Sequence, residues 1–161
     1  MEIDEVKLSD KVIAGLKGKT LKQTYKDGEL ILSWKLENIT AERFLRIDNE
    51  LNHITVYTES TTIKGSPETW LNCIQFISRI NEFLQLGCLE IEPESYKIRY
   101  RIGQSFHPIT DPMKILNFFI SQHDIVFPKI MESFVEVINN LKSPHEAAHV
   151  FIRPLDFKRI V

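Results

Sequence analysis

The chain has 161 residues, of which 43% are hydrophobic, and this is enough to bury the core of one domain but not of two. Its formal net charge of −2 gives no general attraction to nucleic-acid phosphates or to anionic lipid, so both kinds of partner are disfavoured. Cys73 and Cys88 form no CxxC or zinc-ribbon spacing, and we expect both to be reduced. The acidic first ten residues do not resemble a signal peptide, and no apolar run reaches transmembrane length, so we expect a cytoplasmic protein.

The first part of the chain predicts a short helix followed by four antiparallel strands. Ser9 or Asp10 can cap the start of a helix over residues 9–17, and Gly18 can cap its end. A Lys-Asp-Gly sequence then supplies a tight turn between the first two strands. The expected strands are residues 21–25, 29–36, 43–47 and 53–58. In the third strand the apolar residues do not settle which face points inward, so that point stays open.

Residues 66–84 predict the most informative element, a helix with an unusually broad apolar face. Plotted at about 100° per residue, the polar residues form one narrow stripe and the apolar residues cover the other side. One sheet does not easily cover such a face, so the helix should also contact a second helix, another subunit or a client. We therefore expect an interaction protein that forms a homodimer, with Phe76, Ile80 and Phe83 as its partner-binding residues.

Residues 88–92 and 96–102 predict a hairpin whose second arm alternates between apolar and basic side chains. The apolar residues are Tyr96, Ile98, Tyr100 and Ile102, and the basic residues are Lys97, Arg99 and Arg101. Glu90 and Glu92 on the first arm can lie across from the basic residues, so we favour cross-strand charge pairing over phosphate binding. A nucleic-acid-associated regulator that uses the basic stripe is kept as an alternative.

Residues 111–141 predict a long helical region that begins with Pro112 in its first turn and is interrupted near Pro128. Asn81, within the apolar side of the preceding helix, is expected to bond backbone groups of the loop that follows it. The order of elements is therefore α-ββββ-α-ββ-α, an α+β fold in which helices cover an antiparallel sheet made of a meander and a hairpin.

Three segments of this pattern resemble the YbjN family, whose fold is similar to that of the type III secretion chaperones. They are the helix end Ile80-Asn81-Glu82-Phe83, the hairpin arm Tyr96-Lys97-Ile98-Arg99-Tyr100-Arg101, and the helix over residues 125–138. The resemblance implies a small, non-enzymatic and often dimeric module, and the secretion relatives bind extended segments of client proteins. We expect residues 1–141 to form one such domain and residues 142–161 to form a C-terminal extension with a short helix.

The sequence His145-Glu146-Ala147-Ala148-His149 matches the HExxH pattern, in which two histidines hold zinc and the glutamate activates water. Its setting argues against this function, because Ser143 and Glu146 fit the first and last positions of a helix capping box. We therefore predict no catalytic residues, no metal and no cofactor, and we favour a chaperone-like or adaptor module that binds a protein client. A small zinc-dependent hydrolase using His145, Glu146 and His149 is the alternative. Its third ligand would have to come from Asp156, His123 or Glu132.

Overall fold

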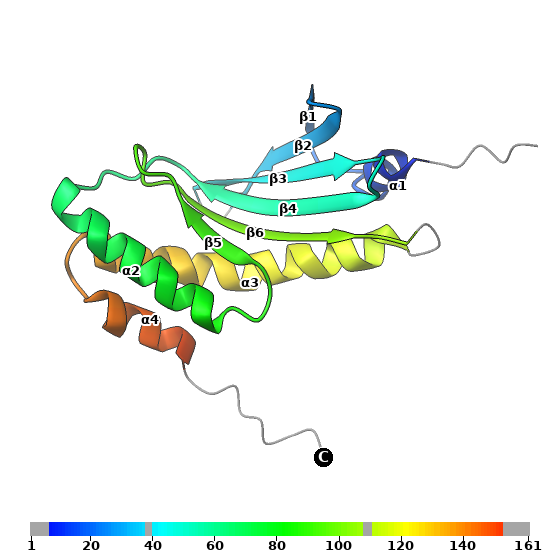
Figure 1. The fold of residues 1–161 in the computed structure, drawn as a ribbon. Coiled ribbons are helices and arrows are strands. Elements are labelled where there is room, and N and C mark those ends of the chain that lie inside the picture. Colours follow the sequence, from blue (N-terminus) through cyan, green and yellow to red (C-terminus); the bar gives the residue numbers. More distant parts are fainter. Residues whose placement is uncertain (1–6, 38–39, 108–110, 153–161) are drawn as a thin grey trace, which may run out of the picture.

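A six-stranded antiparallel sheet forms one layer of the fold, and helices cover one of its faces (Figure 1). The structure is a computed structural model that describes residues 7–37, 40–107 and 111–152. Its strands are β1 (Lys22–Lys26), β2 (Glu29–Lys35), β3 (Ala41–Asp48), β4 (His53–Ser60), β5 (Cys88–Ile91) and β6 (Ile98–Ser105), in the spatial order β1-β2-β3-β4-β6-β5. Its helices are α1 (Leu8–Gly15), α2 (Pro67–Phe83), α3 (Pro112–Ile138) and α4 (Pro144–Ile152). The α+β class and the predicted order of elements are confirmed.

Local sequence explains most of these elements. Asp27 and Gly28, which join β1 to β2, have φ angles of 52° and 82°, and two successive positive angles match the twist of paired strands. In β6 the predicted alternation holds, because Ile98, Tyr100 and Ile102 are at most 2% exposed. The open question about β3 is resolved as well. Its inward residues are Ala41, Arg43, Leu45 and Ile47, all buried, so a charged side chain lies within the apolar set.

The predicted interruption near Pro128 is wrong, because α3 continues unbroken from Pro112 to Ile138. A proline inside a helix lacks the N–H that would bond to the carbonyl four residues earlier, at a cost of about 3 kcal/mol. The buried residues Phe127, Ile130 and Phe134 lie on both sides of this position and anchor the helix to the core. Tertiary packing therefore outweighs the local preference. No helix in the described part of the chain is both long and apolar enough to cross a bilayer.

Two other helices cover much of the broad apolar face of α2. α3 runs along the sheet, and α2 and α4 pack beside it (Figure 1). Phe76 of α2 lies against Phe134 of α3, with ring centroids 6.1 Å apart. Ala147 and Ala148 of α4 are completely buried in the same core. The part of the expected extension that forms α4 is therefore packed into the domain.

Candidate partner-binding groove

A groove of about 810 Å³ lies between the end of α2, one face of α3 and the end of α4. Four apolar side chains from these three helices line it while remaining largely exposed. They are Phe83 at 41%, Phe118 at 52%, Ile125 at 53% and Val150 at 57%. Isolated exposed apolar residues are common on soluble proteins, but several around one concave surface are typical of a binding site.

α3 supplies the longest wall of the groove. Most of its lining residues recur every three or four positions, which places them in one stripe along the helix. The stripe consists of Phe118, Gln122, Ile125, Lys129, Glu132 and Glu136, and Val126 and Ser133 line the groove beside it. The first half of this stripe is mainly apolar and the second half is charged, with Glu136 paired to Lys142 at 2.8 Å. The groove therefore has an apolar end and a polar end.

A polar cluster, buried except for Asp124 at its edge, connects the opposite side of α3 to the sheet. Arg43 of β3 is 2% exposed, and its Nη2 donates to Asp124 Oδ1 at 2.8 Å. Its Nε donates to Thr58 Oγ1 at 3.2 Å. The same oxygen lies 2.9 Å from Nδ1 of His123, whose ring packs on Tyr100 with centroids 4.5 Å apart. Charged and polar groups are rarely buried without such partners, so the cluster holds α3 in one position.

The cluster also sets the rotation of α3 about its axis. His123 is completely buried, which directs the flank that carries Phe118, Gln122 and Ile125 away from the sheet. At about 100° per residue, these three positions lie roughly 100° to 160° around the helix from His123. The buried contacts of His123 therefore fix the direction in which the groove residues point.

His123 is held in its neutral form by this environment. Burial away from water and the nearby charge of Arg43 lower the pKa of His123 from 6.5 to about 3. An arginine always donates, so Thr58 Oγ1 accepts from Arg43 and can donate its own proton to Nδ1.

The structure separates the three residues expected to bind a partner. Phe83 lies on the wall of the groove and is 41% exposed, and Ile80 lines the groove from below at 0% exposure. Phe76 does not line the groove and is also 0% exposed, because α3 covers it. The expectation that Phe76 presents a partner surface is therefore wrong for the chain in this conformation, and Ile80 contributes only to the floor.

Phe118 and Ile125 were not identified from the sequence as partner-binding residues. The available signal was the run of adjacent apolar residues around each of them, at positions 118–120 and 125–127. A helix that packs on one sheet cannot direct three consecutive apolar residues to the same side. One residue of each run therefore had to face solvent or another partner.

The predicted capping box at the start of α4 is confirmed. Glu146 Oε2 accepts hydrogen bonds from the backbone N–H of Ser143 at 2.9 Å and from its hydroxyl at 2.7 Å, while Ser143 Oγ accepts from Glu146 N. These bonds lower the pKa of Glu146. The rings of His145 and His149 lie 6.3 Å apart, and among the described residues no three potential ligands gather around a metal position. Asp156 lies outside the described residues.

The expected cross-strand charge pairing in the hairpin is present for Glu90, whereas Glu92 accepts a hydrogen bond from the hydroxyl of Ser95 instead. Glu90 pairs with Arg101 at 3.0 Å, and Arg99 additionally donates from Nε to Glu59 Oε2 of β4 at 3.0 Å, a partner that the sequence did not indicate. Glu59 therefore neutralises part of the basic stripe from the neighbouring strand. Asn81 bonds both the N–H and the carbonyl of Leu89, so its amide joins the end of α2 to β5.

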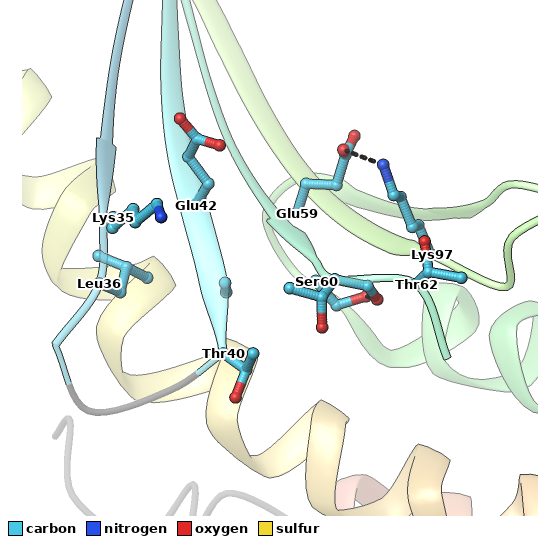
Figure 2. Close-up of a pocket in the computed structure, with 10 residues that line it drawn as sticks. Lys35, Leu36, Thr40, Glu42, Glu59, Ser60, Thr62 and Lys97 are labelled. Atoms are coloured by element: carbon cyan, nitrogen blue, oxygen red, sulfur yellow. Dashed lines mark hydrogen bonds and ion pairs between the residues drawn. The ribbon is translucent and has the colours of Figure 1, made fainter. Parts of the chain in front are cut away.

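A second pocket, of about 470 Å³ and lined mainly by polar residues, lies at the ends of β2, β3 and β4 (Figure 2). Glu59 and Lys97 form an ion pair at 3.5 Å along its wall. Ser60 Oγ donates to the carbonyl of Thr61 and accepts from the N–H of Ile98, both at 3.0 Å. Because these groups are bonded within the chain, the apolar groove is the stronger candidate for binding.

The fold and the groove define an α+β domain that carries a largely apolar groove between three helices. No family model matches the chain, and no curated protein matches it. Among solved structures, the chain is similar to the crystal structure of YbjN from E. coli, described as a proposed transcription regulator. The two share 14% identity over 83% of this chain and 90% of YbjN, with a TM-score of 0.46. This is the family that the sequence resembles, and the likeness concerns the fold alone.

Proposed function

We propose that this chain is a non-enzymatic protein-binding module, chaperone-like or adaptor in type, that receives an apolar segment of another protein in the groove between α2, α3 and α4. The observation that carries the proposal is the convergence of Phe83, Phe118, Ile125 and Val150 on one concave surface. A partner of matching chemistry is a short amphipathic segment, with apolar side chains for the apolar end and charged side chains for the end near Glu132 and Lys142.

The exposed area indicates the strength of such binding. Covering the exposed half of a phenylalanine removes roughly 100 Å² of apolar surface from water and contributes about 2.5 kcal/mol. Phe83, Phe118 and Ile125 together therefore give a gross gain of about 7 kcal/mol, from which the entropy of association must be subtracted. The proposal accordingly predicts weak, reversible binding that distributes over several side chains.

The test is site-specific photocrosslinking in the native cell. Phe118 is replaced by benzoylphenylalanine, an aromatic photoreactive residue that fits an exposed aromatic position. The matched control carries the same residue in place of Tyr25, which is 74% exposed on β1. We expect a discrete crosslinked protein from position 118 and none from position 25. Adding Ile125→Ser to the position 118 variant should reduce the product at least fivefold.

Two results would contradict this proposal. Crosslinks of equal intensity from both positions would show that the groove is not selected by the partner. A product at position 118 that contains only a second copy of the chain, or only a small hydrophobic molecule, would assign the groove to self-association or to ligand binding instead.

A further inference from the structure

We infer that the C-terminal segment of this chain, residues 153–161, docks into the same groove and competes with the partner. The segment reads Arg-Pro-Leu-Asp-Phe-Lys-Arg-Ile-Val and follows directly after α4. This inference rests on the proposed function, because it names the regulation of the site described there.

The groove lies where the segment begins. Val150 and Phe151, in the last turn of α4, already line the groove, so the described part of the chain ends at its edge. Nine extended residues reach at most about 30 Å. The groove stripe on α3, from Phe118 to Glu136, is about 27 Å long at 1.5 Å per residue. The segment can therefore reach any part of the groove without a change in α4.

The composition of the segment matches that of the groove. Four of its nine residues are apolar, namely Leu155, Phe157, Ile160 and Val161, and they suit the surface formed by Phe83, Phe118 and Ile125. Its basic residues are Arg153, Lys158 and Arg159, but the polar end of the groove carries both signs of charge, since Lys129 and Lys142 lie beside Glu132 and Glu136. The apolar residues of the segment therefore carry the match, as they would in a partner.

Attachment to α4 gives the segment an advantage over a free partner. A short tether provides an effective concentration on the order of 1 mM, so a segment with an intrinsic dissociation constant of about 0.1 mM occupies the groove roughly ten to one. A competing partner then binds about tenfold more weakly than it would to an open groove. A partner must therefore displace the segment before it binds.

The experiment uses a fluorescent synthetic peptide of residues 153–161 as the probe and measures its binding to the full-length chain by anisotropy. One variant carries Leu155→Ser, Phe157→Ser and Ile160→Ser, which remove the apolar side chains of the segment. The matched control carries Arg153→Ser, Lys158→Ser and Arg159→Ser. We expect the probe to bind the apolar-to-serine variant about tenfold more tightly than the wild type, and to lose this gain when Ile125→Ser is added.

A second measurement follows the groove residues by NMR in the absence of the probe. Compared with the wild type, the apolar-to-serine variant should show shifted backbone amide resonances of Gln122 and Lys129, and the basic-to-serine control should show smaller shifts. Equal probe affinity for all variants, or unchanged amide resonances, would overturn docking of the segment. Either outcome is distinguishable from failure of the proposed function, because that test depends on crosslinking of a partner at position 118.

Discussion

His123 provides a sensitive test of how α3 is held on the sheet. The side chain is completely buried and its pKa is lowered to about 3, first by the loss of water and then by the charge of Arg43. In the unfolded chain the imidazole regains an ordinary pKa near 6.5. We predict that the free energy of unfolding falls as the pH is lowered from 7 to 5, and that replacing His123 by glutamine removes most of this dependence.

The sign and the magnitude follow from proton linkage. Below pH 6.5 the unfolded chain binds a proton at His123 that the folded chain does not bind, so acid favours unfolding. At pH 5 the solution is about 1.5 pH units below the pKa of His123 in the unfolded chain, so the free energy of unfolding is lower by about 2 kcal/mol. The loss is complete only near pH 3, where the folded state also takes up the proton. The result at pH 5 is insensitive to the folded pKa as long as it stays below about 4.

The assay is urea unfolding followed by tryptophan fluorescence at pH 7, 6 and 5. The control is His149→Gln, which changes an exposed histidine on α4 and should leave the pH dependence unchanged. His123→Gln should lower stability at pH 7, because the amide does not reproduce the ring packing against Tyr100, but its stability should change little down to pH 5. Equal slopes for the wild type and His123→Gln would refute a buried, neutral imidazole.

Three further predictions concern the rest of the molecule. Arg99→Glu should destabilise the fold by roughly 0.5–1 kcal/mol in urea unfolding through loss of its pairing with Glu59, and complete loss of partner binding at unchanged stability would instead make the basic stripe a recognition surface. Metal analysis should find substoichiometric zinc and unchanged thermal stability after chelation, and loss of one tightly held equivalent in His145→Ala would favour the hydrolase. We still expect a homodimer, which sedimentation should show, and Phe76→Ala should cost about 3–5 kcal/mol of stability because its side chain is completely buried. A wild type that is monomeric at high micromolar concentration would contradict the dimer.

The sequence by itself determined the elements and their order, because these depend on interactions between residues close along the chain. The alternation of β6, the turn at Asp27 and Gly28, and the capping box between Ser143 and Glu146 were all predicted and are all present. The strand requires only alternation with a period of two, the turn requires positive φ angles, and the capping box requires two residues three positions apart. The sequence also predicted that Asn81 bonds backbone groups shortly after its helix, although it did not identify Leu89 as the partner. This was possible because the two residues are only eight positions apart.

Only the tertiary structure decided which apolar and charged side chains are covered. Arg43 and His123 are buried together because α3 packs against β3 and β4, which lie far from it along the chain, so that Arg43 meets Asp124 and Thr58 meets His123. Helix α3 continues through Pro128 because burial on both sides of the proline outweighs its local cost. Phe76 is covered by α3, while Phe118 and Ile125 are left exposed at the groove. The spacing of apolar residues indicates how much apolar surface a helix must cover. The packing of elements that are distant along the chain determines which of those side chains remain exposed.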